Sequence, residues 1–285
     1  EVIGLNRSVV NLLDLEATKK IIQKIKPNLV IDAAAKVGGI GANNMLPVEF
    51  LSDNLRIQSN LMEAAHAADV EKFIFLGSSC IYPRDCAQPI KEEYLLTGPL
   101  EETNSAYAIA KIAGIELIKS FRKEYGRKWI SLMPTNLYGP RDNFELQGSH
   151  VLPAFIRRFV EAQAEGRAKE TLWGTGSPMR EFLHVDDLAS AVVLAGAKYD
   201  SAVHMNIGSG EDLTIKALAQ LVAELAGFKG EIAWDSSKPD GTPRKVLDVT
   251  KVKSLGWSPA ISLRDGIAST IEWYIDATAK GVSRR

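Results

Sequence analysis

The chain has 285 residues, enough for one large hydrophobic core or two modest ones. Its formal net charge is −1, whereas a general surface for nucleic acid or anionic membranes needs a basic excess, so we expect neither partner. No apolar run approaches the roughly 20 residues of a membrane-spanning helix, and no signal-peptide pattern opens the sequence. The only cysteines are Cys80 and Cys86. We therefore expect reduced thiols and a cytoplasmic location.

The first 35 residues lack the unit that normally opens a dinucleotide-binding fold. Residues 1–5 are expected to form a strand, residues 16–26 a helix and residues 28–35 a buried strand. No Gly-rich turn with G-x-G-x-x-G spacing accompanies them. Because the strand before that turn is central in the 3-2-1-4-5-6 order, its absence would leave a gap of about 9–10 Å. We therefore expect this sequence to be an amino-terminally incomplete copy of a longer product.

Residues 72–82 are the segment around which we expect the site to form. An apolar run over residues 72–76 predicts a buried parallel strand, and it breaks at Gly77 into Ser78, Ser79 and Cys80. In open α/β sheets, ligands bind at the carboxyl ends of the strands. In an extended chain Ser78 and Cys80 would point to the same side. The sequence therefore predicts polar groups at the mouth of a crevice.

A helix that follows carries Tyr107 and Lys111, four residues apart and so on one face. A phenol with a pKa of about 10 is a poor acid or base near neutrality, and a nearby ammonium lowers that pKa. Any amphipathic helix can produce this spacing. After a strand that ends in two serines, however, a hydroxyl, a phenol and an ammonium can converge on one carbonyl oxygen.

The rest of the chain alternates between strand and helix patterns. The helix over residues 107–125 carries a wide apolar stripe, which covers either the sheet alone or the sheet and a second subunit. These patterns predict an α/β fold, a Rossmann-type doubly wound parallel sheet with a smaller α/β region. The expected division is a cofactor domain at 1–140 with 181–208, and a substrate region at 141–180 with 209–285. The further expected segments are a helix at 47–68, a strand at 129–133, a turn-rich stretch at 134–140, a helix at 151–164, a helix from 184, a strand at 204–208, a helix at 213–225 and a loop at 238–244.

Several residues can carry chemistry, and each also has a structural interpretation. The Cys80 thiol is either a proton carrier or a small apolar filler, and His150 is either its partner or a helix cap. Trp173 either stacks on a base or packs as core. The four histidines show no metal-ligand spacing, so we expect no metal. The candidate clamps for a diphosphate are Arg157, Arg158, Arg180 and Arg244.

Six motifs resemble those of the GDP-L-fucose synthase family, which belongs to the extended short-chain dehydrogenase/reductases. They are Ser-Ser-Cys-Ile-Tyr-Pro at 78–83, Tyr-Ala-Ile-Ala-Lys at 107–111, Met-Pro-Thr-Asn-Leu-Tyr-Gly-Pro at 133–140, Ser-His-Val-Leu-Pro at 149–153, Pro-Met-Arg-Glu-Phe-Leu-His-Val-Asp-Asp at 178–187 and Lys-Pro-Asp-Gly-Thr-Pro-Arg at 238–244. The Tyr-x-x-x-Lys motif is shared across the superfamily. The Ser-Ser-Cys, Ser-His-Val and Lys-Pro-Asp-Gly-Thr-Pro-Arg motifs are specific.

The resemblance implies NADPH-dependent conversion of GDP-4-keto-6-deoxy-D-mannose to GDP-L-fucose by epimerisation at C3 and C5 and reduction at C4. It implies that Cys80 is the base and His150 the acid of the epimerisation. Tyr107 would protonate the alkoxide, with Ser78 bonded to that oxygen and Lys111 lowering the phenol's pKa. The family is a homodimer, which would explain wide helical stripes.

The resemblance also implies which residues bind each ligand. Arg7, at the end of the expected strand 1–5, is placed to meet a 2′-phosphate, which favours NADPH over NADH. The implied cofactor residues are Arg7, Asn11, Leu12, Leu76, Gly77, Ser78, Ser79, Lys111, Pro134, Thr135, Asn136, Leu137 and His150. The implied substrate residues are Asn136, Arg158, Trp173, Arg180 and Asp240.

Three alternatives remain open on the sequence. One is another nucleotide-sugar enzyme of this fold, such as a 4-epimerase or a 4,6-dehydratase. A second is a GDP-colitose synthase, whose chemistry differs at one ring hydroxyl. The third is a non-catalytic nucleotide-sugar binding module that lacks the cofactor loop.

Overall fold

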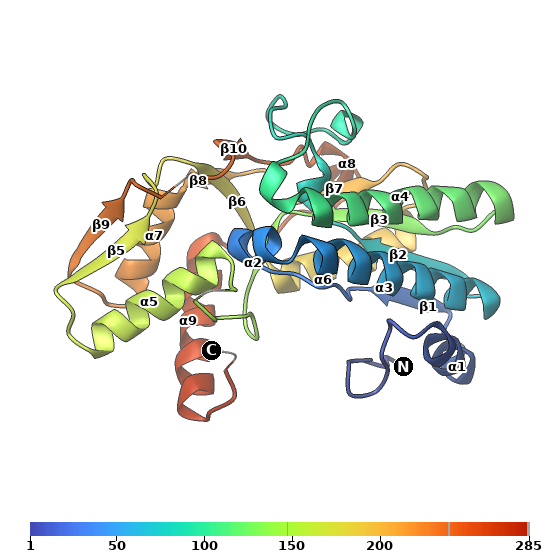
Figure 1. Cartoon of the computed structure of the whole chain (residues 1–285), viewed down its shortest axis with the longest axis horizontal. Coiled ribbons are helices and arrows are strands. Elements are labelled where there is room, and N and C mark those ends of the chain that lie inside the picture. The colour runs from blue at the N-terminus through green and yellow to red at the C-terminus, as the bar shows by residue number, and fades with distance from the viewer. Residues whose placement is uncertain (147, 239, 284–285) are drawn as a thin grey trace.

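A four-stranded parallel sheet lies at the centre of the larger half of the molecule (Figure 1). The computed structural model describes residues 1–146, 148–238 and 240–283. The strand order is β1-β2-β3-β7, and each neighbouring pair is parallel, with Ile74 opposite Ile130 in the register of β2 and β3. The α/β fold class predicted from the sequence is confirmed. The strand bounds are β1 Leu29–Asp32, β2 Lys72–Leu76, β3 Ile130–Pro134 and β7 Met205–Ile207.

Helices cover both faces of this sheet. Alternate residues of a strand point to opposite faces, and in β2 the ring of Phe75 lies against Gly114 of α4 (Ser105–Tyr125) while Ile74 lies against Gly196 of α6 (Val185–Lys198). The helix α3 (Pro47–Ala67) packs beside α4, as Figure 1 shows. Phe73, Ile74 and Phe75 are fully buried between these layers, because an apolar β-branched and aromatic strand can be covered on both sides.

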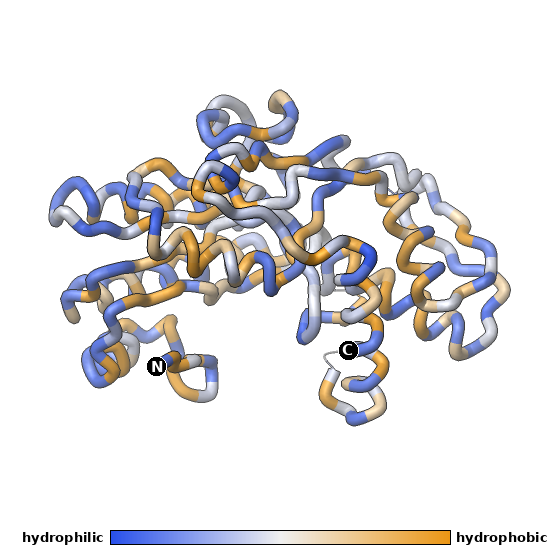
Figure 2. Tube along the Cα trace, turned by 180° about the vertical axis from the view of Figure 1, so that it is seen from behind, coloured by the Kyte–Doolittle hydropathy of each residue, from blue (hydrophilic) through white to orange (hydrophobic). Residues whose placement is uncertain are grey.

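The smaller half is built from short strands and three helices around a second buried cluster, which includes Phe144, Phe159 and Tyr274. In Figure 2 hydrophobic residues run along the helices of both halves, and most outer loop tips are hydrophilic. One mixed sheet contains β4 Asn136–Tyr138, β6 Met179–His184, β8 Asp212–Thr214 and β10 Arg244–Lys245, and a two-stranded sheet contains β5 Lys169–Trp173 and β9 Glu231–Asp235. The helices are α5 Val151–Ala164, α7 Ile215–Leu225 and α9 Leu263–Ala279.

The remaining elements are short connections. The first helix is capped by Asp14, whose side chain accepts from the backbone N–H of Ala17 at 3.0 Å, as an N-cap aspartate should. The sequence analysis assigned no helix to the segments that form α2, α8 and α9. The bounds are α1 Leu15–Ile25, α2 Ile40–Met45, α8 Thr250–Ser254 and the 3₁₀ turns η1 Ser79–Ile81, η2 Glu92–Tyr94 and η3 Glu102–Asn104.

Three expectations about local structure are wrong. Residues 1–5 form no strand, and Val2 is 98% exposed, because a strand needs a neighbour for its backbone groups and none lies beside this segment. The four strands are contiguous, so the described residues contain no open gap in the sheet. The stretch at 134–140 is not only turns, since β4 within it pairs in parallel with β6. Turn-forming residues at its ends concealed this three-residue strand.

Candidate functional site

The carboxyl end of β2 carries the first part of the site. The backbone N–H of Gly77 donates to Leu132 O at 2.8 Å, and a Cβ here would lie 2.3 Å from Met133 Cε, so a larger residue would require the Met133 side chain to move. The chain then enters η1, where Ser78 Oγ accepts from Cys80 N at 3.2 Å. The expected extended conformation is therefore wrong. A hydroxyl followed by free N–H groups favours this tight turn, which carries Ser78 and Cys80 together.

The first turns of α4 bring Tyr107 and Lys111 to the same place. The Ser78 hydroxyl lies close enough to Tyr107 to act on the pKa of its phenol. The Lys111 ammonium donates to Leu76 O at 2.9 Å and lies over the rings of Phe75 at 4.7 Å and Tyr107 at 5.9 Å. The hydroxyl, phenol and ammonium predicted from spacing are thus gathered at one strand end.

The expected lowering of the phenol's pKa is not found in this arrangement. Burial raises the pKa of Tyr107 above its usual value, with the charges of Cys80 and Asp32 acting in the same direction and the Ser78 hydrogen bond opposing them. Burial also lowers the pKa of Lys111. The ammonium is directed at a carbonyl rather than at the phenol oxygen. Tyr107 is therefore held protonated, as a proton donor must be.

Asp32, at the end of β1, is a buried acid that the sequence analysis missed. Its Oδ1 accepts from Ala34 N at 3.1 Å, and its Oδ2 has no hydrogen-bond partner. Burial raises the pKa of Asp32 to about 6, although the charge of Lys111 opposes the rise. The signal in the sequence was an aspartate closing an otherwise apolar strand.

The sulfur of Cys80 contacts two nitrogen donors. Asn104 Nδ2 and Lys245 Nζ each lie 3.6 Å from Sγ. These three residues line a small cavity of about 30 Å³ together with Arg84 and Glu101. Asn104 and Lys245 were not predicted, because they lie 24 and 165 residues from Cys80 along the chain and stand in no recognisable spacing with it.

His150 stands at the N-cap of α5, and its side chain makes no capping hydrogen bond. The residue as a whole is exposed, yet the protein atoms around its ring lower its pKa. The loop before it is tied down, because Gly39 N donates to Gly148 O at 3.1 Å. The adjoining helix α2 packs against η3, which ends at Asn104. The loop before His150 is therefore connected to the surroundings of Cys80 through α2 and η3.

The implied cofactor residues of the first segment lie beside α3. Asn60 of that helix donates to Leu12 O at 2.8 Å, and Asn11 Oδ1 accepts from Leu13 N at 3.1 Å. Arg7 lies in a turn and is exposed, so the expected position at the end of a strand is wrong. The reason is again that residues 1–5 have no neighbouring strand.

Glu181 joins the ends of three elements beneath residues 134–137. Its fully buried carboxylate accepts from Gly210 N at 2.7 Å and from Leu247 N at 2.9 Å, and burial raises its pKa. Its carbonyl accepts from Asn136 Nδ2 at 2.8 Å. Thr135 N donates to Ile207 O at 2.9 Å. The implied cofactor residues Pro134 and Leu137 flank this junction.

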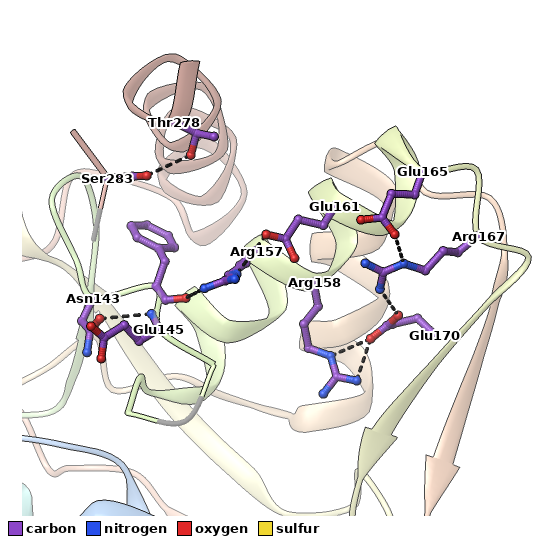
Figure 3. Close-up of polar contacts among 11 residues, drawn as sticks. Asn143, Glu145, Arg157, Arg158, Glu161, Glu165, Arg167, Glu170, Thr278 and Ser283 are labelled. Carbon is purple, nitrogen blue, oxygen red and sulfur yellow. Dashed lines mark hydrogen bonds and ion pairs between the residues drawn. The ribbon is translucent and has the colours of Figure 1, made fainter. Parts of the chain in front are cut away.

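The four candidate arginines have different surroundings. Arg158 is directed at Glu170, with Nε 2.6 Å from Oε1, and Figure 3 shows this pair beside Arg167. Arg157 and Arg244 pair with Glu161 and Asp212.

Arg180 is the candidate arginine whose pKa is affected by the charge of Cys80. It donates to Met179 O at 2.8 Å. Burial lowers its pKa, while the charges of Cys80 and Asp240 oppose this. Arg180 thus lies within electrostatic range of Cys80, whereas Arg158 lies against the buried carboxylate of Glu170.

Trp173 is 71% exposed, so its interpretation as core is wrong. Lys238 Nζ lies 5.8 Å from the centre of its ring. Asp240 accepts from Thr175 N at 2.9 Å and from Thr175 Oγ1 at 2.7 Å. An open aromatic face therefore stands near a fixed turn at the end of β5. Among the described residues, no group of three or more His, Cys, Asp or Glu side chains could hold a metal ion, and no helix is long and apolar enough to cross a membrane.

Comparisons with known proteins agree with this geometry. The model of the NAD dependent epimerase/dehydratase family matches residues 1–208. GDP-L-fucose synthase of Escherichia coli is 50% identical over 285 residues, which cover 97% of this chain and 89% of that protein. The chain belongs to the GDP-L-fucose synthase family. Putative GDP-L-fucose synthase 2 of Arabidopsis thaliana is 57% identical over 251 residues, 88% of this chain and 76% of that protein.

A solved structure of this family has the same fold. The GDP-L-fucose synthetase of Naegleria fowleri, crystallised with NADP bound, superposes with a TM-score of 0.90 at 28% identity, over 99% of this chain and 87% of that one. The family resemblance read from the six motifs is thereby confirmed.

Proposed function

We propose that this chain converts GDP-4-keto-6-deoxy-D-mannose to GDP-L-fucose, with NADPH as reductant. One observation carries the proposal. The Cys80 sulfur, contacted by Asn104 Nδ2 and Lys245 Nζ at 3.6 Å each, lies close enough to Tyr107 for its charge to act on the pKa of the phenol, as the Ser78 hydroxyl also does. A reductase needs the phenol but not the thiol, whereas an epimerase acting beside a ketone needs a second proton carrier.

The epimerisation uses the acidity of hydrogens next to the C4 ketone. Cys80 Sγ takes the proton from C3 or C5, and the electron pair of the broken C–H bond moves to form an enolate on the C4 oxygen. His150 returns a proton from the opposite face of the ring, which inverts the carbon. The protein atoms around His150 lower its pKa, so the ring is mostly neutral near neutrality and must take up a proton before it acts as the acid of this step.

The reduction needs a proton at the C4 oxygen. Bound NADPH supplies the hydride. Tyr107 donates its proton to the developing alkoxide, and Ser78 hydrogen-bonds the same oxygen. Because burial keeps Tyr107 protonated, this donor is ready before the alkoxide forms.

The residues present fit the nicotinamide end of the cofactor. Lys111 and Tyr107 converge at the carboxyl end of β2, and Lys111 would hold the ribose there. Leu76 to Ser79 and residues 134–137 would flank it, with Asn11, Leu12 and Arg7 toward the adenosine. The printed sequence holds no G-x-G-x-x-G turn for the pyrophosphate.

The substrate residues divide between the sugar and the nucleotide. Arg180, near Cys80 and Asp240, is placed for the diphosphate, and the exposed Trp173 offers a face to the guanine. Asn136 adjoins the sugar end. Arg158 would serve the diphosphate only after leaving Glu170.

We assign residues 1–140 and 181–208 to cofactor binding, and residues 141–180 and 209–285 to substrate binding. The two buried clusters support this division, although Leu247 and Trp257 pack with the first. The outer face of α4, where Ile109 is 45% exposed, is proposed to pair with a second copy of the chain. Two free thiols suit the cytoplasm, the location that we propose.

The test is to incubate the protein with GDP-4-keto-6-deoxy-D-mannose and NADPH and to identify the product by NMR. We expect GDP-L-fucose together with loss of NADPH absorbance. A product reduced at C4 without inversion at C3 and C5, or an unchanged absorbance, would refute the proposal.

A further inference from the structure

Asn104 occupies the N-cap of α4 but does not cap the helix. Asparagine is favoured at this position because its side-chain oxygen accepts a free N–H of the first turn. Thr214 does so at α7, with Ala217 N at 3.0 Å, and Ser262 at α9, with Asp265 N at 3.1 Å. Asn104 makes no such bond. The Asn104 side chain, although suited to capping, therefore does not cap α4.

The amide of Asn104 is directed at the thiol instead. Its Nδ2 lies 3.6 Å from Cys80 Sγ, and its Oδ1 is buried without a hydrogen-bond partner. A buried acceptor that lacks a donor is costly, and such atoms are rare in folded proteins. Neither Nδ2 nor Oδ1 of Asn104 is therefore used to stabilise the helix. Local rules broken in this way are expected at functional sites.

Asn104 lies between the two proposed catalytic residues, Cys80 and Tyr107. It ends η3, and Tyr107 stands one turn further along α4. A proton at C3 or C5 is removed fast only if Sγ is held in line with the C–H bond. The η1 turn fixes the backbone of Cys80 through the bond to Ser78 Oγ. The Nδ2 contact fixes the side chain.

We propose that Asn104 is a positioning residue for the epimerisation. Its Nδ2 holds Cys80 Sγ toward the sugar carbon, and its Oδ1 accepts a hydrogen bond from a ring hydroxyl of the bound sugar. This inference rests on the proposed function, because only a sugar beside the thiol supplies that hydroxyl.

The experiment measures solvent deuterium uptake into GDP-4-keto-6-deoxy-D-mannose at C3 and C5, in D₂O and without NADPH. Asn104→Ser removes both amide contacts but supplies a hydroxyl that can cap α4. We expect about tenfold slower uptake, as for a lost hydrogen bond in the reaction geometry. We expect the free energy of unfolding to be unchanged or higher. A purely structural role would instead lower both together.

Two further variants separate the roles. Asn104→Asp keeps an acceptor oxygen and loses the donor, so uptake should slow while the KM for the sugar stays within about twofold of wild type. Thr214→Ala, the matched control, removes a working cap from α7 and should lower stability while leaving uptake unchanged.

The outcomes are distinct. Wild-type uptake in a folded Asn104→Ser variant overturns the role of Asn104 and leaves the proposed function standing. If Asn104→Ser does not fold, the same result from Asn104→Asp overturns it. Absent uptake in the wild-type protein contradicts the proposed function itself, and the role of Asn104 then falls with it.

Discussion

Asp32 is an acid in surroundings that do not favour its charge. Its raised pKa of about 6 means that the folded protein holds this proton to a higher pH than the unfolded chain does. As pH rises from about 4 to 6, the unfolded chain loses the proton first, so stability falls over that window. The shift from 3.8 corresponds to about 3 kcal/mol at most.

His204 acts in the opposite direction. Burial lowers its pKa to about 4, and its ring contacts Tyr82 Oη at 3.0 Å. Below about pH 6.5, His204 is protonated in the unfolded chain but not in the folded protein, so stability falls as pH falls from 6.5 to 4. Between pH 4 and 6 the two residues therefore have opposing slopes.

The variant Asp32→Asn should reveal this balance. The amide keeps an acceptor for Ala34 N but carries no charge. The difference in the free energy of unfolding between pH 7.5 and pH 4 should therefore shift in favour of pH 7.5, by up to about 3 kcal/mol. The loss of the negative charge beside Lys111 reduces this gain. Urea unfolding at several pH values measures this. A profile parallel to that of wild type would show that Asp32 is ionised at no cost in the folded protein.

Among the elements, α4 carries the most constraints. It holds Tyr107 and Lys111 toward the site and packs Gly114 against the ring of Phe75, where a Cβ would lie 2.3 Å from Cζ. Alanine is otherwise the better helix former. Here the clash must move either α4 or the fully buried Phe75, over which the Lys111 ammonium lies.

We expect Gly114→Ala to lower the free energy of unfolding by about 1–3 kcal/mol, through overpacking. Gly41→Ala in α2 is the matched control, since a Cβ there meets nothing within 4 Å, and it should be neutral or slightly stabilising. Urea unfolding compares the two. Equal stabilities for both variants would show that the contact between α4 and β2 yields without cost.

Some helices and strands could be predicted from the sequence and others could not. The helices α3, α4 and α5 were predicted to within two residues, because apolar residues recur at three and four over long segments. The strand at 1–5 was wrong, since strand formation depends on a neighbour rather than on composition. Within the site, Tyr107, Lys111 and Cys80 carry local signals. Asn104 and Lys245 do not, because folding alone brings them to the sulfur.

At the scale of the whole molecule, the two buried clusters meet along β4 and β6, with Glu181 at the junction. The wide stripe of α4 leaves Ile109 outside both clusters and 45% exposed. A stable symmetric interface needs an apolar centre of this kind.

We expect Ile109→Glu to convert a dimer into a monomer, because a carboxylate would be buried without a partner at the interface. Light scattering during size-exclusion chromatography gives the mass. Val193→Glu on α6, where the valine is 71% exposed, is the control that should remain dimeric. A wild-type protein that elutes as a monomer would refute the pairing.

The central claim is that a thiol removes protons beside the sugar's ketone. The most direct measurement is deuterium uptake at C3 and C5 of GDP-4-keto-6-deoxy-D-mannose in D₂O, compared between wild type and Cys80→Ser. A serine hydroxyl is a far weaker base, so uptake should fall by about a hundredfold or more while the folded stability stays close to wild type. Undiminished uptake in Cys80→Ser would contradict the account.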